Sequence, residues 1–448
     1  MRTFQLLVVN TLAANVTNNF LWFALTFWVF LETQSVLATA IVGGSYMLLA
    51  SVSGMFVGTF VDRHRRRTSM LLSSGASLVA FALAGVVYLV APGPALRDLG
   101  HPAFWLFIAL ILGGAIAGSL RMVALMTSVT LLVPEDRRDR ANGLVGTANG
   151  VAFAITSVFS GLAVGLLGMG WSVGIAVVLT ALVLGHLLTI NIDEAAPTPE
   201  EGAPKLIDVR GAIRAIGVVP SLFALLLFST FNNLLGGVFM ALMDPYGLTL
   251  MPVETYGIVL AITSLGFIVG GAVVARRGLG TNPVRTLLLA VVVMWVVTIV
   301  FPIRSEILPL AIGFFIYLFL APVAEASEQT IVQRVVPFQE QGRVFGFAQT
   351  LETAASPITA FLIGPIAQFW VLPSMTDGAL ADAFGPWFGT GPDRGLALIF
   401  IVAGVIGLLV TLFALRSRQY RELSERYAAA PEPKMPEADA PDAPPAAA

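Results

Sequence analysis

Four charged side chains lie inside long apolar segments of the sequence, where a charge is costly. Glu325 and Glu328 stand three residues apart in one segment, so they share one face of a helix. Glu352 lies nine residues into the next segment, and Arg121 lies in an earlier one. A charge at the centre of a bilayer costs at least ~2.5–3.5 kcal/mol on insertion scales, so such residues are expected to face a cavity and to have partners.

The three glutamates are candidates for carrying protons. Removing a carboxyl group from water disfavours its charged form, so a carboxyl group in an apolar helix can hold a proton near neutral pH. We therefore predict proton coupling at Glu325, Glu328 and Glu352. For Glu352, the alternative is a place near the inner surface, facing water. Three other acids at segment ends are expected to be solvated, namely Glu32, Asp244 and Glu254.

Uncharged amides form a second group of polar residues in apolar segments. One segment near the N-terminus carries three asparagines and a tryptophan at helical spacing, and its Asn-Asn pair recurs 214 residues later. Amides in an apolar cavity suit a large, weakly polar substrate, whereas the alternative is hydrogen bonding between helices, worth about 0.6 kcal/mol for each contact. The candidates for lining a substrate site are Asn15, Asn18, Asn19, Trp22, Asn232 and Asn233.

The composition places these residues in a membrane. Of the 448 residues, 57% are hydrophobic and only 12% are charged, against about 25% charged in a typical soluble protein. The chain has no cysteine, which excludes disulfides and thiolate metal sites, and its three histidines lack the spacing of a metal site. It also has no phosphate-binding Gly-x-x-x-x-Gly-Lys-Ser/Thr loop. We therefore expect no metal, no cofactor, no ATP-driven transport, no nucleic-acid partner and no enzyme active site.

Twelve hydrophobic segments are each long enough for a transmembrane helix of ~20 residues. The first is too long for the apolar region of a signal peptide, so it is expected to be retained. The segments predict an all-α polytopic membrane protein whose twelve transmembrane helices form two pseudo-symmetric six-helix bundles. The predicted spans are 4–31, 36–61, 68–91, 103–133, 141–168, 171–191, 217–243, 254–275, 284–302, 307–335, 343–372 and 395–416.

The basic residues orient this arrangement. With the N-terminus inside, 21 of the 25 lysines and arginines fall on the inner side, three fall in outer loops, and Arg121 lies within a span. This bias predicts that both termini are cytoplasmic in a multi-pass protein of the cell membrane. The predicted domains are an N-terminal six-helix bundle over 1–191, a cytoplasmic linker over 192–216, a C-terminal six-helix bundle over 217–427 and a disordered cytoplasmic tail over 428–448.

Internal repeats support the division into two bundles. At an offset of 203 residues, VPEDRRDRANGLVGT (133–147) falls on VPFQEQGRVFGFAQT (336–350), and Gly161 falls on Gly364. At an offset of 214 residues, Gly43 falls on Gly257. Repeated halves with a site at their interface near the bilayer midplane are typical of alternating-access transporters.

The segment 58–67, which reads GTFVDRHRRR, joins two of the apolar segments. Together with RANGL at 140–144 and QGRVFGF at 341–347, it resembles the major facilitator superfamily, and most closely its macrolide-efflux-like drug exporters. The resemblance covers about 4–416. It implies a monomeric secondary transporter in the lipid bilayer that exports a hydrophobic or amphiphilic small molecule in exchange for protons. The alternative is an importer or facilitator of a small solute on the same fold, which would not need the protonatable glutamates.

The resemblance also implies a role for Arg121. In this family the first and fourth helices of each half line the cavity, and the 203-residue offset places Glu325 opposite Met122, at nearly the depth of Arg121. Arg121 is therefore expected to meet Glu325 across the cavity and to tune its proton affinity. The alternative is a static ion pair that locks two helices together.

A gating role for segment 58–67 follows from the same resemblance. Gly58 is expected to let two helices approach, and Asp62 is expected to accept hydrogen bonds from the start of the eleventh span, where an anion is favoured. The alternative is that the arginines only set the topology and that Asp62 only caps a helix. The candidate gating residues are Gly58, Asp62, Arg63, Arg67 and Arg343.

Overall fold

A computed structural model describes residues 2–132, 155–190, 220–336 and 338–429 of the chain. Every regular element within these ranges is a helix. Nine of the described helices are long and apolar enough to cross a membrane. The predicted all-α polytopic fold is therefore confirmed.

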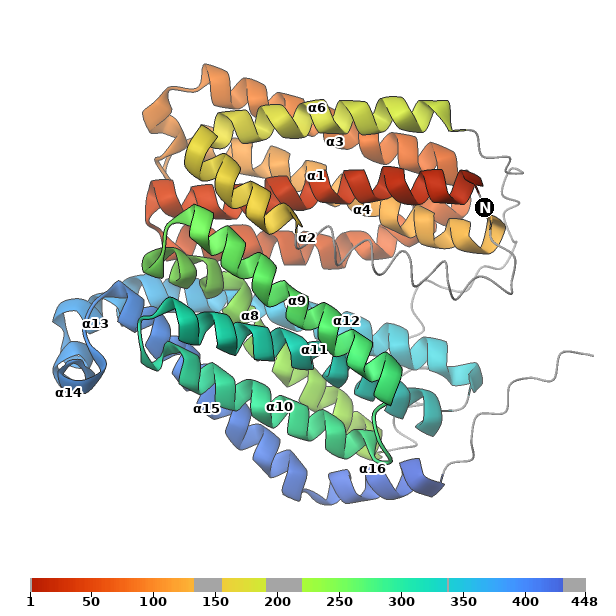
Figure 1. The fold of residues 1–448 in the computed structure, drawn as a ribbon, viewed down its shortest axis with the longest axis vertical. Coiled ribbons are helices and arrows are strands. Elements are labelled where there is room, and N and C mark those ends of the chain that lie inside the picture. The colour runs from red at the N-terminus through yellow and green to blue at the C-terminus, as the bar shows by residue number, and fades with distance from the viewer. Residues whose placement is uncertain (1, 133–154, 191–219, 337, 430–448) are drawn as a thin grey trace, which may run out of the picture.

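The helices fall into two groups that follow each other along the chain (Figure 1). The first group consists of α1 (Arg2–Thr33), α2 (Val36–Arg63), α3 (Arg66–Val90), the 3-10 turn η1 (Gly93–Leu96), α4 (Pro102–Leu132), a helix over Ile155–Leu167 that ends in the π-helical turn η3 (Ala163–Leu167), and α6 (Met169–Thr189). The second group consists of α8 (Pro220–Leu250), α9 (Val253–Arg277), α10 (Pro283–Val300), the 3-10 turn η4 (Phe301–Ile303), α11 (Ile307–Val335), α12 (Phe338–Ile366), the π-helical turn η5 (Ala367–Val371), α13 (Leu372–Asp377), α14 (Ala379–Phe388), α15 (Pro392–Arg416) and α16 (Arg418–Ala429).

Each of the twelve predicted spans coincides with one of these helices. The fifth does so only over Ile155–Leu167, because residues 141–154 lie outside the described ranges, as does the predicted linker over 192–216. Three short helices were not expected from the sequence, α13, α14 and α16. All three are shorter than a span, and α16 is largely polar, so a search for long apolar runs passes over them.

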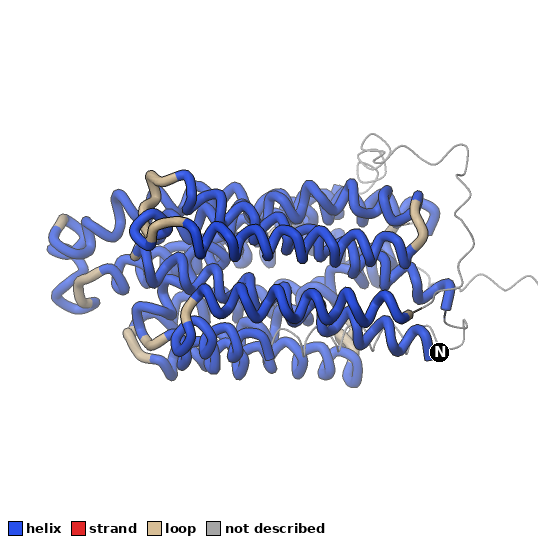
Figure 2. Tube along the Cα trace, turned by 90° about the horizontal axis from the view of Figure 1, so that it is seen from above, coloured by secondary structure: helices blue, strands red, loops and turns tan. Residues whose placement is uncertain are grey.

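The long helices run side by side, and the connections between them gather at two ends of the molecule (Figure 2). We name these ends after the short helices that lie there, the α14 end and the α16 end. The chain begins α1 and finishes α16 at the same end (Figure 1). The two groups of helices touch at the α14 end and diverge toward the α16 end (Figure 1).

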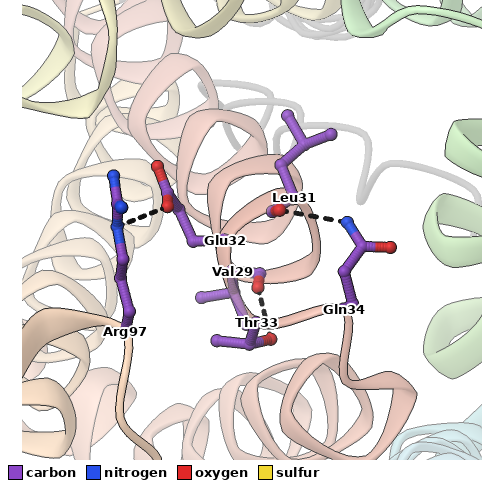
Figure 3. Close-up of polar contacts among 6 residues, drawn as sticks. All are labelled: Val29, Leu31, Glu32, Thr33, Gln34 and Arg97. Carbon is purple, nitrogen blue, oxygen red and sulfur yellow. Dashed lines mark hydrogen bonds and ion pairs between the residues drawn. The ribbon is translucent and has the colours of Figure 1, made fainter. Parts of the chain in front are cut away.

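The junction between α1 and α2 illustrates the tight connections at the α14 end (Figure 3). Gln34 adopts a left-handed conformation (φ 49°), and its side-chain amide donates to the carbonyl oxygen of Leu31 at 3.0 Å. Arg97 pairs with Glu32 at 2.7 Å between Nε and Oε2 (Figure 3). Glu32 therefore has a partner on the surface, although an exposed pair of this kind contributes at most about 1 kcal/mol.

The contacts between the two groups cluster at the α14 end and use small residues. A Cβ added to Gly161 would lie 2.6 Å from the carbonyl oxygen of Val253, and one added to Gly257 would collide with the carbonyl oxygen of Ser157. At a second crossing, a Cβ added to Gly364 would lie 2.7 Å from the Cβ of Ala40. The backbones at both crossings are thus too close for a larger side chain.

These two crossings are related by the repeat in the sequence. Gly161 and Gly364 are paired by the 203-residue offset, and Gly43, on the same turn of α2 as Ala40, is paired with Gly257 by the 214-residue offset. The helix over Ile155–Leu167 meets α9 in one crossing, and α12 meets α2 in the other. Both fifth helices also end in a π-helical turn, η3 and η5. The two crossings therefore join helices that the repeat relates to each other.

Buried apolar side chains extend the contact between the groups. One cluster lies within the first group and includes Phe81, Phe104 and Phe107. The second cluster fills the second group and continues into the first through Phe23 and Phe27 of α1. The ring of Phe27 lies edge-on to Tyr256 of α9, with centroids 5.5 Å apart. The α14 end is therefore packed as a common core of both groups.

Candidate functional site

A cavity of about 370 Å³ lies among α8, α10, α11 and α12, within the second group of helices. Its polar and aromatic walls include Asn232 and Asn233 of α8, Trp295 of α10, Glu325 and Glu328 of α11, and Glu352 of α12. Five of these six residues were predicted as site residues from the sequence. The cavity thus brings together all three candidate proton carriers and two of the candidate substrate-lining amides.

Two of the glutamates form a hydrogen-bonded pair. The carboxyl groups of Glu328 and Glu352 are joined by a hydrogen bond, and the hydroxyl of Ser229 also donates to Glu328. Two carboxyl groups bond in this way only when one of them carries a proton, because both oxygens are otherwise acceptors. Glu328 lies seven residues before the end of α11 at Val335, or about 10 Å along the helix. The two carboxyl groups therefore lie close enough to share a proton inside the bundle.

Glu325 differs from the other two glutamates. It is exposed in the cavity wall, and its Oε1 accepts one long hydrogen bond of 3.4 Å from Gln329 Nε2, one turn along the same helix. It lies three residues from Glu328, close enough for the two charges to interact. Glu325 is therefore the most accessible carboxyl group of the cavity.

The two asparagines of α8 hold the cavity wall in place. The indole Nε1 of Trp295 donates to Asn232 Oδ1 at 2.8 Å, while Asn232 Nδ2 donates to the carbonyl oxygen of Phe228 at 2.8 Å. Asn233 Nδ2 donates to the carbonyl oxygen of Ser229 at 3.1 Å. Asn232 therefore positions the tryptophan, which is only 2% exposed. The sequence did not suggest Trp295, because a lone tryptophan in an apolar span is equally compatible with lipid contact.

Arg121 occupies a separate place in the first group of helices. Its side chain is 1% exposed, and it donates to Asn10 Oδ1 at 2.9 Å and to Ser74 Oγ at 2.7 Å. The expected meeting of Arg121 with Glu325 is therefore wrong for this structure. The sequence offset gave the depth of each residue but not the direction of its side chain, which for Arg121 points toward α1 and α3.

Removing these contacts is expected to destabilise the protein. Arg121→Met would leave the buried acceptors on Asn10 and Ser74 without a donor, at a cost of about 1–3 kcal/mol each. We expect the midpoint of thermal unfolding in detergent to fall by several degrees. Arg97→Met is the matched control, because Arg97 is exposed and its pair with Glu32 contributes little. Equal midpoints for the two variants would contradict a structural role for Arg121.

The candidate lining residues of α1 are not brought to the large cavity. Asn18 lies beside Gly118 of α4 in a small pocket of about 10 Å³ that it shares with Arg121. The ring of Trp22 stacks on Tyr46 of α2, with centroids 4.2 Å apart. Asn15 and Asn19 are half-buried on the same helix and do not line the large cavity. In this structure, the asparagines of α1 therefore do not share a site with the asparagines of α8.

The candidate gating segment is mostly helical. α2 continues to Arg63 and α3 begins at Arg66, so Gly58 and Asp62 lie on the last turns of α2 rather than in a loop. The side chains of Asp62, Arg63 and Arg343 lie outside the described part of the structure, and the latch stays a prediction. The guanidinium of Arg67 donates to the carbonyl oxygen of Leu188 at 3.0 Å, at the end of α6. A cation is favoured there by the helix dipole.

The sequence missed a polar contact at the α14 end. Asp244 was expected to face water, but α8 continues past it to Leu250, and the hydroxyl of Tyr256 donates to Asp244 Oδ1 at 2.9 Å. Thr26 of α1 reaches the same carboxyl group. The expectation failed because the predicted span ended at residue 243, before Pro245, which the helix accommodates. Asp244 thus joins the two groups of helices.

Glu254 was likewise expected to be solvated. Its carboxyl group packs directly against Gly165 in the π-helical turn η3, and the residue is half-buried. Both corrections have one cause. The ends of the spans meet the other group of helices at the α14 end, and a hydropathy pattern does not reveal which span ends are covered.

Comparison with known proteins adds evidence of kinship. The family model described as Major Facilitator Superfamily matches residues 7–360. The enterobactin exporter EntS of Shigella flexneri is 22% identical over 386 residues, covering 86% of this chain and 85% of that protein. The EntS of Escherichia coli O1:K1 / APEC is 23% identical over 390 residues, with 86% and 85% covered.

Solved structures share the fold. The nucleoside transporter NupG has a TM-score of 0.67 at 10% identity and covers 93% of this chain and 100% of its own. A bacterial homologue of the human lysosomal transporter Spinster, inward-facing and unoccupied, has a TM-score of 0.62 at 14% identity, with 95% and 98% covered. At these identities, the likeness establishes the fold alone.

Proposed function

Because the chain belongs to the major facilitator superfamily, we propose that this secondary transporter exports a hydrophobic or amphiphilic small molecule in exchange for protons. The family consists of transporters, so the protein is a multi-pass membrane protein that moves a small molecule and is not an enzyme. Export and proton exchange go beyond the family. The convergence of Glu325, Glu328 and Glu352 on one cavity is the observation that carries the proposal.

Protons and substrate compete for the cavity, and this competition couples their movements across the membrane. The proton shared by Glu328 and Glu352 sits in the wall of the space that the substrate enters. Loss of that proton adds a negative charge to the cavity, and its return removes the charge again. A substrate that binds the deprotonated form better than the protonated form displaces the proton, so the two are exchanged each time the cavity opens to the other side of the membrane.

The charge distribution supports an orientation. The described basic side chains at the α14 end are Arg97, Arg304 and Arg394, whereas those of the α2–α3 junction, the end of α9 and α16 lie at the α16 end. The positive-inside rule then assigns the α16 end to the cytoplasm. On that assignment, the contacts at the α14 end close the outer side, and the cavity loads from the cytoplasm, as an exporter requires.

The substrate class remains part of the proposal. The resemblance of segments 58–67, 140–144 and 341–347 to the macrolide-efflux-like exporters supports a drug-like substrate. A second candidate is enterobactin, favoured by the similarity to the EntS exporters over 86% of the chain. An importer or facilitator on the same fold would not depend on protonation of the three glutamates.

Inverted membrane vesicles test the proposal. With the interior made acidic, addition of a transported compound should dissipate the gradient faster in vesicles that contain the protein than in empty ones, because each substrate entering releases a proton. The panel would include enterobactin and amphiphiles of positive, negative and zero charge, and a pH-sensitive dye would report the gradient. Uptake of a labelled compound at a rate indifferent to the gradient would rule out proton exchange.

A further inference from the structure

Among the described residues, the charged side chains that line the large cavity are all acidic. Three carboxyl groups line it, and none of the described residues that line it is basic. One proton shared between Glu328 and Glu352 neutralises only one of the three carboxyl groups, and no basic residue among the described lining offsets the others. Uncompensated charge within a membrane is costly, so the cavity is incomplete without a positive partner.

Two described arginines within or at the end of a span, Arg121 and Arg334, are engaged elsewhere. Arg121 is held by Asn10 and Ser74 in the first group of helices. Arg334, at the end of α11, lies over the ring of Tyr427 of α16, with its guanidinium carbon 4.6 Å from the ring centroid. Neither arginine lines the cavity.

Aromatic rings in the wall suit a cation. The indole of Trp295 is fixed by its hydrogen bond to Asn232, and a Cβ added to Gly407 of α15 would collide with the ring, so glycine leaves the space that Trp295 fills. Tyr317 lines the same cavity and stacks on Phe239, with centroids 4.7 Å apart. Rings held in this way attract a cation with no further loss of side-chain freedom.

The cavity fits an organic cation better than a metal ion. Its volume of about 370 Å³ is in the range of small-molecule sites. Apolar side chains of Val291, Met294 and Val332 complete its walls. Among the described residues, no group of three acidic or histidine side chains is arranged to hold a metal ion. A ligand with apolar bulk and one positive charge matches both features.

We infer that the transported substrate is an organic cation, which binds in this cavity with Glu325 as its counter-ion and with the rings of Trp295 and Tyr317 beside it. Glu325 is suited to this role because it is exposed and because its hydrogen bond to Gln329 is a long one of 3.4 Å. The Glu328–Glu352 pair then keeps the exchangeable proton. The inference rests on the proposed function, of which it names the substrate class.

Binding of two matched ions to the purified protein tests the inference. Tetraphenylphosphonium and tetraphenylborate carry the same four phenyl groups and opposite charges, so they separate charge from hydrophobicity. In equilibrium dialysis against detergent-solubilised protein, corrected for empty micelles, we expect the cation to bind at least roughly tenfold more tightly than the anion. Equal affinities, or tighter binding of the anion, would overturn the inference.

Variants of Glu325 test whether this residue is the counter-ion of the bound cation. Glu325→Gln should weaken binding of the cation roughly tenfold or more, whereas Glu325→Asp, which keeps the charge, should retain most of it. Glu306→Gln is the matched control, because Glu306 is exposed before α11 and does not line the cavity. A folded Glu325→Gln protein that binds the cation like the native protein would overturn the assignment.

Failure of this inference is distinguishable from failure of proton exchange. Binding in detergent requires no gradient, so cation binding without gradient-driven transport would refute the exchange and leave the cation site standing. Gradient-driven transport of a neutral or anionic compound, without binding of the cation, would refute the cation site and leave the exchange standing.

Discussion

Glu328→Gln is expected to lower gradient-driven transport roughly tenfold or more, as is common when a positioned proton carrier is lost. Glutamine has nearly the same shape as glutamate but cannot release a proton, so the hydrogen bond to residue 352 can persist while the exchange stops. Downhill movement of substrate without a gradient should continue. The measurement is the initial rate of uptake into inverted vesicles, with and without an imposed pH gradient.

Glu352→Gln should have the same effect, because its carboxyl group is hydrogen-bonded to Glu328 and we propose that the two share one proton. Since the residues act as a unit, the double variant should lose little more than either single variant. Glu306→Gln again serves as the control, at an exposed position outside the cavity. Unchanged gradient dependence in both single variants would remove the pair from the mechanism.

Gly257→Val is expected to force the α14 end open. A Cβ at this position would collide with the carbonyl oxygen of Ser157, which belongs to backbone and cannot turn aside, so the two helices must separate. Separation would also pull Thr26 away from Asp244 and loosen the contact between Phe27 and Tyr256. We expect a shift of the population toward forms open at the α14 end, with a loss of transport.

Labelling of a single cysteine measures this opening. The natural chain has no cysteine, so Ala40→Cys introduces the only thiol, at a fully buried position packed against Gly364. Reaction with a membrane-impermeant maleimide in intact cells should be faster when Gly257→Val is also present. Because the maleimide cannot cross the membrane, labelling in intact cells would also test whether the α14 end faces outward.

A second glycine of the same helix supplies the control for this experiment. A Cβ added to Gly271 of α9 would meet nothing within 4 Å, so Gly271→Val changes helix composition without separating the two groups. Labelling at position 40 that is equally fast in both valine variants would show that the crossing at Gly257 does not close the α14 end.

The helices were predictable because membrane spans follow from composition alone. The predicted span 307–335 has the bounds of α11, which begins directly after Ser305 and Glu306 and ends two residues before Pro337. The same reasoning missed the short helices α13, α14 and α16, since none of them has a long apolar run. It also ended the seventh span at residue 243 and therefore misjudged Asp244.

The site residues that carry a carboxyl group were predictable, because burying a charged side chain in a membrane is costly. Glu325, Glu328 and Glu352 stand out in any apolar sequence, and their convergence on one cavity agrees with that expectation. Trp295 and the accompanying role of Asn232 did not stand out, because neither is costly in a span. Their importance arises from the hydrogen bond between them.

The sequence by itself determined that this protein is a helical membrane protein, where its spans lie to within a few residues and which ionisable residues lie inside them. These properties depend on the transfer of each residue from water to lipid, which is local to the chain. Only the tertiary structure decided that Arg121 turns to Asn10 and Ser74 while the three glutamates share a cavity. Such partnerships depend on the rotation of each helix about its axis, and that rotation is set by packing between helices far apart in the chain.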